Sequence, residues 1–309
     1  MEKQSLSLFV CPYCHGVLKQ TYVHGDFGIV RCMCDEYPIV AGILFLQKNE
    51  AMTNRRVVTR IRQKQYAQAL FMLLDGTRIQ RFLLFCLFYL RFHFRIYISR
   101  MRVLQTLRIV SPNASWFRYL LHRDTDAEIS ATASLLGSFA GQSSIILDIG
   151  CGIGHVFEVF QKKHPTFSGR YIGIDKSPSS LLLARLYMDI THFQLISCSV
   201  DIGIPLRDST VSCVVSLDSL AYIHAKKMVI KEVCRVLKTQ GIFYILHMYT
   251  NSPKTRFWGY GMDPKELKKL LMCDFQSFSF RNIYTSTLQY GLLKQTLDRA
   301  NYSCVARKL

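Results

Sequence analysis

Acidic residues are scarce in this 309-residue chain, since 21 Asp and Glu stand against 39 Lys and Arg and give a formal net charge of +18. The imbalance excludes an acidic disordered chain, and a hydrophobic content of 50% argues against disorder of any kind. A basic chain favours an anionic partner, which leaves nucleic acid, an anionic membrane surface and an acidic substrate open. The length suggests about two domains with room for a sizeable core.

Long apolar runs are also missing. The longest one outside the strand-like segments is Phe82–Leu90, nine residues, whereas a helix that crosses a bilayer needs about 20. The start, MEKQSLSLFV, lacks the apolar region of a secretory signal. The eleven cysteines are an odd number in a chain too long to need disulfide staples. We therefore expect a cytoplasmic protein with thiols free or bound to metal, with peripheral attachment to a membrane as an alternative.

Most of the positive charge lies in residues 51–123, which contain thirteen Arg and one Lys against one acid. If the stretch around Phe82–Leu90 is one helix, four arginines fall within roughly an 80° arc of it: Arg81, Arg91, Arg95 and Arg102. Such a helix suits an anionic membrane surface or the phosphates of RNA. It could equally pack its apolar side on the main domain and leave the arginines in solvent. Residues 51–142 are thus expected to form an arginine-rich helical connector or lid.

The first 50 residues predict a small β-rich unit with a metal site. Two cysteine pairs flank a predicted turn at residues 24–26: Cys11, Cys14, Cys32 and Cys34. Four thiolates from two short clusters suit a tetrahedral, structural Zn²⁺ ion. The second pair is CxC rather than CxxC, so His15 or His24 is an alternative ligand, and a metal-free hairpin is the competing interpretation.

The residues that follow, EYPIVAGILFL at 36–46, resemble the end of small zinc-ribbon domains of the Trm112-like type. The CxC and Leu44, where that family often has proline, depart from its pattern. Modules of this family often precede a methyltransferase domain.

From residue 143 strands alternate with helices, which predicts a parallel sheet with helices on both faces. A short buried strand at 144–149 leads directly into GCGIGH at 150–155 and then into a helical stretch. Alternate glycines let the backbone turn sharply and approach a ligand. The spacing is GxGxG rather than the GxGxxG of dinucleotide sites. Asp148, two positions before the first glycine, suits a cationic ligand, so the turn favours S-adenosylmethionine over NAD.

The second strand of this region ends in an acid, Asp175, 25 residues after Gly150. A carboxylate at this place can accept hydrogen bonds from both ribose hydroxyls. Ser177 and Pro178 then predict the N-cap and first position of the next helix.

Two later stretches, DIGIPLRDSTVSCVVS at 201–216 and KEVCRVLKTQGIF at 231–243, resemble motifs of class I S-adenosylmethionine-dependent methyltransferases. They are closest to the group that methylates small molecules, quinones and lipids. With the glycine turn and Asp175 they follow the family's order and spacing across residues 143–309. The resemblance implies an α/β fold, with a Rossmann-like seven-stranded sheet, helices on both its faces and a small N-terminal zinc-ribbon-like module.

The resemblance also implies S-adenosylmethionine as cofactor. The residues it assigns to the cofactor are Asp148, Gly150, Cys151, Gly152, Gly154, Asp175, Lys176, Asp201 and Leu217. Asp201 stands for the acid that contacts the adenine amino group, although Val200 occupies that acid's usual position. Ser212 and the pair Thr239-Gln240 replace residues that are common in the family. These replacements do not change any of the carboxylates that the resemblance assigns to the cofactor.

Methyl transfer depends mainly on alignment, and a general base is needed only when the acceptor must lose a proton. The candidate catalytic residues are Tyr222 and Asp218, in the loop after the fourth strand, with His224 and His247 as further candidates. This loop lacks the Asn/Asp-Pro-Pro-aromatic signature of enzymes that methylate amines of bases. We therefore expect a small-molecule or lipid-like acceptor and no DNA partner.

Two other functions remain open. A known type of rRNA guanine methyltransferase also joins a four-ligand zinc module to this fold, and the connector's charge would suit RNA. A non-enzymatic binding module that kept the fold is the third possibility, and the intact glycines and carboxylates speak against it.

Overall fold

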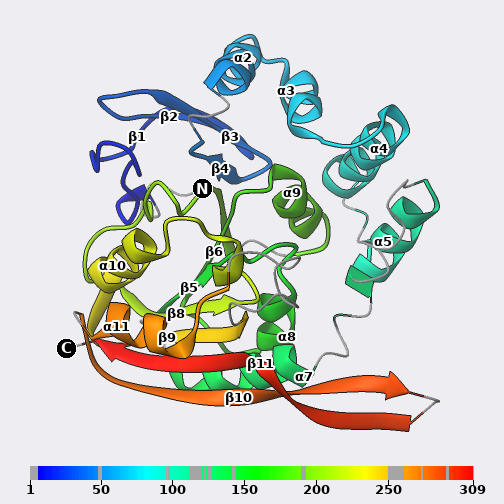
Figure 1. Ribbon diagram of the computed structural model, residues 1–309. Helices are drawn as coiled ribbons and strands as arrows, with labels where there is room; N and C mark the ends of the chain where they lie inside the picture. Colours follow the sequence, from blue (N-terminus) through cyan, green and yellow to red (C-terminus); the bar gives the residue numbers. More distant parts are fainter. Residues whose placement is uncertain are drawn as a thin grey trace.

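The computed structural model joins all strands of its described residues into one mixed sheet (Figure 1). It describes residues 6–47, 51–94, 96, 98–110, 120–121, 123, 127–140, 144–188, 193–249, 261–272, 274–289 and 292–308. The strands are β1 (Lys19–His24), β2 (Phe27–Arg31), β3 (Glu36–Val40), β4 (Ile43–Phe45), β5 (Ile145–Ile149), β6 (Arg170–Asp175), β7 (Phe193–Ser197), β8 (Val211–Leu217), β9 (Leu237–Tyr249), β10 (Phe275–Gln289) and β11 (Leu292–Lys308). The helices are α2 (Ala51–Arg62), α3 (Tyr66–Leu73), α4 (Arg78–His93), α5 (Arg100–Ile109), α7 (Ala127–Leu136), α8 (His155–Lys163), α9 (Pro178–Tyr187), α10 (Lys226–Val236) and α11 (Pro264–Leu271), with 3-10 turns η2 (Gly137–Phe139) and η3 (Leu220–Tyr222).

The seven C-terminal strands have the order β7-β6-β5-β8-β9-β11-β10. The first five of these are parallel, and β11 pairs antiparallel with both β9 and β10. This confirms the α/β fold and the seven-stranded sheet that the sequence predicts. The predicted start of α9 is confirmed too, because the Ser177 side chain accepts from the Ser180 amide and Pro178 is the first helical residue.

The N-terminal strands extend this sheet. They form an antiparallel ladder in the order β1-β2-β3-β4, and β4 then pairs in parallel with β7, Leu44 opposite Ile196. The Leu46 amide donates to the Ser197 carbonyl at 2.8 Å, which continues the pairing beyond the strand. The predicted β-rich unit is therefore hydrogen-bonded edge to edge with the parallel sheet, an arrangement that its sequence does not indicate.

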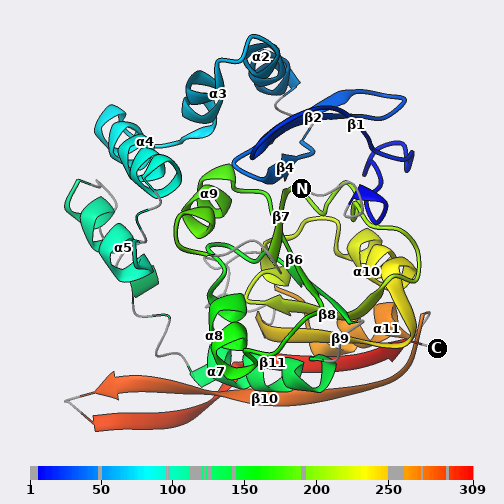
Figure 2. The same ribbon diagram turned by 180° about the vertical axis from the view of Figure 1, so that it is seen from behind.

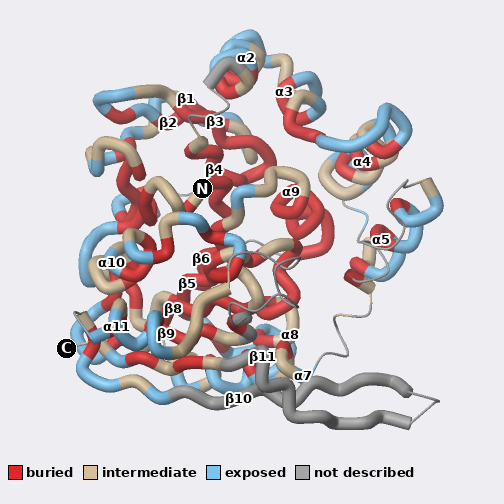
Figure 3. The backbone as a smooth tube through the Cα atoms, in the orientation of Figure 1, coloured by how far each residue is buried: buried red, intermediate tan, exposed pale blue. Residues whose placement is uncertain are grey.

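Helices cover both faces of the sheet (Figures 1 and 2). Alternate strand residues face opposite sides, so Ile146 joins the core under α7, α8 and α9, whereas Leu147 joins the core under α10 and α11. Figure 3 shows the buried residues gathered along the strands and the inner sides of these helices. Among the described helices, none has the length and apolar composition needed to cross a membrane.

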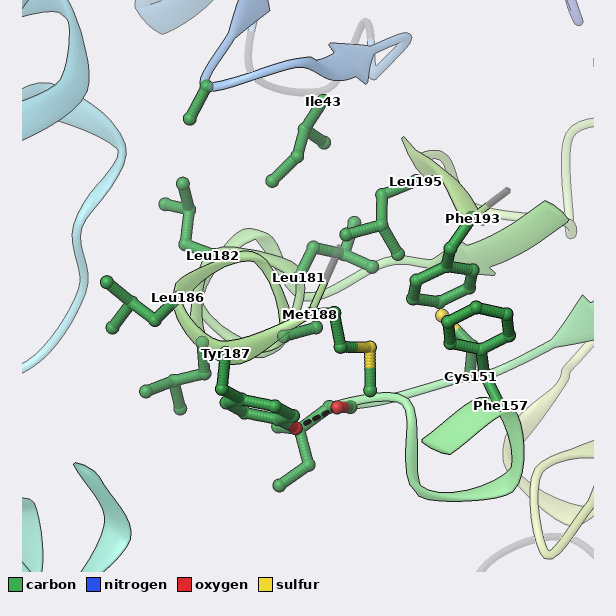
Figure 4. Packing of buried hydrophobic residues seen from close by; sticks show 14 of the residues in the cluster. Ile43, Cys151, Phe157, Leu181, Leu182, Leu186, Tyr187, Met188, Phe193 and Leu195 are labelled. Carbon is green, nitrogen blue, oxygen red and sulfur yellow. Dashed lines mark hydrogen bonds between the residues drawn. The ribbon is translucent and has the colours of Figure 1, made fainter. Parts of the chain in front are cut away.

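A packed aromatic and aliphatic cluster holds the turn after β5 in place (Figure 4). The rings of Phe157 and Phe193 stack with centroids 4.2 Å apart. The Tyr187 hydroxyl at the end of α9 donates to the Ile153 carbonyl in the turn. Buried Ile43 of β4 belongs to the same core, so the N-terminal strands, α9 and the glycine turn are packed as one body.

The connector differs from its prediction. The segment expected as one arginine-faced helix is two helices, α4 and α5, because Phe94 ends the first and Ser99 begins the second. A capping box between Thr77 and Gln80 begins α4. The prediction that four arginines share one arc of a single helix is thus wrong. Arg81 and Arg91 belong to α4, whereas Arg102 belongs to α5. Arg95 lies outside the described residues.

Candidate active site

Two adjoining cavities, each of about 240 Å³, lie at the carboxyl ends of the parallel strands. The first is lined by Ile149, Gly150, Ile174, Asp175, Lys176, Cys198, Ser199, Val200, Asp201, Asp218, Ser219, Tyr222 and Ile223. The second is lined by Leu120, Arg123, Ile129, Asp148, Gly150, Cys151, Gly152, Ile153, His155, Val156, Leu217, Asp218 and Tyr222. Gly150, Asp218 and Tyr222 line both, so the cavities share a wall. This is where ligands bind in open α/β sheets.

The glycine turn forms the floor between the cavities. Gly150 has a positive φ of 73°, and a Cβ there would lie 2.3 Å from the Cβ of Ser219. The Ser219 hydroxyl donates to the Ile149 carbonyl at 2.5 Å and locks the turn to the loop after β8. A Cβ on Gly152 would meet nothing within 4 Å, so space is open in front of this residue. The turn thus combines a crowded side toward the protein with an open side toward a ligand.

Asp175 connects the turn to α9. One carboxylate oxygen accepts from the Gly152 amide at 2.9 Å, and the other accepts from the Ser177 amide at 2.8 Å. Burial raises the pKa of this carboxyl, against the effect of these hydrogen bonds. Each oxygen has a second lone pair, so the carboxylate can still accept two hydroxyl groups from a ligand.

Asp148 is only 2% exposed, at the end of β5. The Tyr171 hydroxyl donates to it at 2.9 Å. Burial raises the pKa of Asp148 to about 7, and this hydrogen bond opposes the rise. A buried carboxyl beside an open cavity favours a cationic ligand group. The positive charge of such a group would stabilise the ionised carboxylate, which burial destabilises.

Asp201 lines the first cavity next to Val200. One oxygen of its carboxylate accepts from the amides of His224 and Ala225, at 2.9 and 2.7 Å. Asp201 therefore also fastens the loop after β7 to the residues that lead into α10. Sequence reasoning places it toward a ligand and misses this structural contact.

The shared wall carries an ion pair between Arg123 and Asp218, of which the sequence analysis identifies only Asp218. Arg123, from the connector, lies 3.3 Å from the carboxylate of Asp218, and both side chains are 12% exposed. Burial raises the pKa of Tyr222, and the charge of Asp218 adds to the rise. The tyrosine hydroxyl is thus a hydrogen-bond donor rather than a base. Nothing in the sequence separates Arg123 from the twelve other arginines of residues 51–123.

The cavities bring together most of the residues expected from the sequence. Of the cofactor and catalytic candidates, the following line a cavity: Asp148, Gly150, Cys151, Gly152, Asp175, Lys176, Asp201, Leu217, Asp218 and Tyr222. Gly154 lines neither and instead forms the left-handed N-cap of α8. His224 is exposed and lines neither cavity, and the side chain of His247 lies outside the described residues.

A second constellation lies in the N-terminal unit. The sulfur atoms of Cys11, Cys14, Cys32 and Cys34 all lie within 4.8 Å of one another. Four thiolates around zinc at about 2.3 Å would lie about 3.8 Å apart, so this set fits a structural Zn²⁺ ion despite its CxC. His24 is not part of the cluster, because its ring stacks on Tyr66 at 4.8 Å. Among the described residues, the candidate ligand set consists of the four cysteines that the sequence predicts.

Comparison with known proteins agrees with this geometry. Residues 147–245 match the family model described as a methyltransferase domain. Human thiol S-methyltransferase TMT1A is 29% identical over an alignment of 164 positions. The match covers 48% of this chain and 65%, less than two thirds, of that protein.

Two solved structures resemble the chain more distantly. Haemonchus contortus phosphoethanolamine N-methyltransferase 2, in complex with S-adenosyl-L-methionine, is 16% identical with a TM-score of 0.45, covering 58% of this chain and 52% of that one. Geranyl diphosphate C-methyltransferase from Streptomyces coelicolor is 15% identical with a TM-score of 0.42, covering 58% of this chain and 76% of that one.

Proposed function

We propose that the chain, whose residues 147–245 match a methyltransferase domain, transfers a methyl group from S-adenosylmethionine to a small, largely apolar thiol. The observation that carries this proposal is the Arg123–Asp218 ion pair in the wall shared by the two cavities. The 29% identical relative, a thiol S-methyltransferase, supports the choice of acceptor.

The first cavity and the glycine turn would hold the cofactor. Asp175 would accept hydrogen bonds from the ribose hydroxyls, and Asp148 would pair with the amino group of the methionine moiety. Lys176, Val200 and Asp201 line the part of the cavity that remains for the adenine. When bound, the cofactor supplies a methyl group already activated on a sulfonium. The protein's own task is then to hold and orient the acceptor.

The second cavity, which Asp148 lines, would hold the methionine end of the cofactor and receive the acceptor beside it. Its walls include the apolar side chains of Leu120, Ile129, Ile153, Val156 and Leu217. A thiol must lose one proton as its sulfur gains a methyl group. The Asp218 carboxylate would accept that proton, and the Arg123 guanidinium would stabilise negative charge developing on sulfur. The Tyr222 hydroxyl can orient the acceptor as a hydrogen-bond donor.

An activity assay with labelled S-adenosylmethionine tests the proposal against a set of acceptors: an alkyl thiol, a phenol, an amine and total RNA. We expect product from the thiol. Arg123→Met should lower kcat/KM for the thiol by about tenfold to a hundredfold, the value of a hydrogen bond to a charged group. Cofactor affinity should not change. Arg102→Met, an exposed arginine on α5, is the matched control and should behave like the parent.

The other outcomes are distinct. Product from RNA or the amine but none from the thiol would overturn the acceptor class. Cofactor binding without product from any acceptor would favour a binding module over an enzyme. Failure to bind S-adenosylmethionine in calorimetry would contradict the assignment of the cavities.

A further inference from the structure

The solvent-facing side of α4 is apolar, contrary to the expectation of an exposed arginine side. Arg81 turns back toward α3, where its guanidinium lies 4.4 Å from the centroid of the Phe71 ring and donates to the Phe71 carbonyl at 3.0 Å. Arg91 donates to the Leu186 carbonyl at the end of α9, at 3.2 Å. The helix thus directs these two arginines at the protein.

Apolar side chains occupy the exposed side instead. Ile79 and Phe82 are 61% and 62% exposed, and Tyr89 and Leu90 are exposed as well. At 100° per residue these four residues lie within about 100° of one another on the helix. The opposite side of α4 is buried through Gln80, Leu84 and Phe88.

The neighbouring segments also carry exposed apolar side chains. Nine of the fifteen large hydrophobic side chains that are exposed in the described part of the chain lie between residues 71 and 109. We define the outer face of the connector by these nine residues: Phe71, Ile79, Phe82, Tyr89, Leu90, Phe94, Ile96, Met101 and Ile109. In Figures 1 and 2, α4 and α5 lie next to each other along one side of the molecule, and Figure 3 shows exposed residues on both. An apolar surface of this kind is typical of an interaction site.

Positive charge surrounds the outer face. Arg78, at the start of α4, is exposed, and so are Arg102 and Arg108 on α5. Residues 51–123 contain a single acid, Asp75. Beside the face, a recess of about 390 Å³ between α2, α3 and α4 is lined mainly by apolar groups of Phe71, Met72 and Phe85, with Arg60 among its lining residues. The recess offers space for part of an acyl chain next to a guanidinium group.

We propose that the outer face of the connector lies in the headgroup region of an anionic lipid bilayer. Aromatic and aliphatic side chains flanked by arginines have the chemistry of helices that lie in a membrane interface, and anionic lipids complement the charge around the face. RNA fits less well, because two of the connector's arginines bond inward while the outermost side chains of α4 are apolar. The proposal concerns attachment only and does not depend on the acceptor.

A vesicle flotation assay with the full, zinc-loaded chain tests this. The probes are vesicles of phosphatidylcholine alone and of phosphatidylcholine with phosphatidylserine. We expect the chain to float with the anionic vesicles. The double variant Ile79→Gln and Phe82→Gln should reduce the bound fraction about tenfold or more, because two apolar side chains lose their burial in lipid. Arg102→Gln and Arg108→Gln should each reduce binding to anionic vesicles by about fivefold.

The matched control is the double variant Val23→Gln and Met272→Gln, which removes two side chains of similar exposure, 57% and 63%, elsewhere on the surface. It should float like the parent. Methyl transfer to a soluble acceptor should be unchanged in all these variants.

Three outcomes would overturn the proposal. The first is no flotation with anionic vesicles. The second is flotation that both double variants retain equally. The third is sedimentation of the parent as a dimer that only the Ile79→Gln and Phe82→Gln variant dissociates, which would assign the outer face to a second copy of the chain.

Discussion

At the ends of β5 and β6, a buried and a half-buried carboxylate accept hydrogen bonds from the groups around them, whereas on α4 apolar side chains face outward and two arginines bond inward. Asp175 accepts two backbone amides, and Asp148 accepts the Tyr171 hydroxyl. Along the connector, Arg81 and Arg91 donate to carbonyl groups of neighbouring helices. In the first region the carboxylates line cavities, whereas in the second region two of the positive charges pack against the protein.

This difference explains why the net charge of the connector does not indicate which of its arginines are exposed. An excess of thirteen positive charges in residues 51–123 suggests an exposed cationic surface, yet individual arginines there have different surroundings. Arg100 is 7% exposed, whereas Arg102 is an exposed residue. Substitutions in the two regions can separate charges that stabilise the fold from charges that meet a ligand.

The largest effect is expected for Arg100. Its guanidinium lies 2.8 Å from the Glu158 carboxylate and 2.7 Å from Nδ1 of His155, so it ties α5 to α8. Arg100→Gln should lower the free energy of unfolding by about 3 kcal/mol, because one oxygen of the partly buried Glu158 carboxylate and the His155 ring lose the guanidinium, while Lys162 still pairs with the other oxygen. Urea denaturation measures this change.

Arg102→Gln, two positions along the same helix, is the matched control and should change the free energy of unfolding by less than about 0.5 kcal/mol. An equal loss of unfolding free energy in the two variants would contradict the distinction between buried and exposed arginines in the connector.

The second effect concerns cofactor affinity. Asp175→Ala removes the carboxylate expected to bind the ribose hydroxyls and also the acceptor for the Gly152 amide. We expect the Kd for S-adenosylmethionine in calorimetry to rise about a hundredfold, the value of about two charge-assisted hydrogen bonds. Asp274→Ala, an acid at the start of β10 outside both cavities, should leave the Kd unchanged. Tight binding by the Asp175→Ala variant would contradict the placement of the ribose.

The sequence predicts the parts of this protein whose residues follow a local pattern. The glycine turn, Asp148 and Asp175 follow strands at fixed spacing, and the four cysteines occur in two close pairs, so the cavity and the cysteine cluster could be located without coordinates. Their chemistry requires these residue types, which leaves a local pattern in the chain.

Features that depend on contacts between distant segments leave no such pattern. The pairing of β4 with β7 joins residues about 150 positions apart. The sequence of a strand does not determine which other strand it pairs with. The Arg123–Asp218 pair joins a connector arginine to the loop after β8. On α4, helical periodicity identifies an apolar and a charged side but does not determine which one the protein covers. The arginines pack inward there because α3 and α9 offer carbonyl groups and a ring at the right place.

The smallest expected effect is a pH dependence from Asp148. Burial raises its pKa to about 7 in the free protein, whereas a cationic amino group needs the ionised carboxylate. Below pH 7 the carboxyl must give up a proton before it pairs, so the affinity for S-adenosylmethionine should fall toward acidic pH by up to about tenfold per pH unit. The free protein should show the opposite trend, because a raised pKa favours the folded state at low pH. Its stability should decline between about pH 4 and pH 7.

Two variants make this pH dependence specific. Asp148→Asn should bind the cofactor weakly and without the slope below pH 7, because no proton is lost. Tyr171→Phe removes the hydrogen bond that favours the ionised carboxyl, so it should move the onset of the affinity loss to higher pH. Calorimetric titrations at several pH values, in buffers of different ionisation enthalpy, count the proton released on binding. If proton release persists in Asp148→Asn, the proton comes from another group. That result would contradict the role of Asp148 in binding the cofactor.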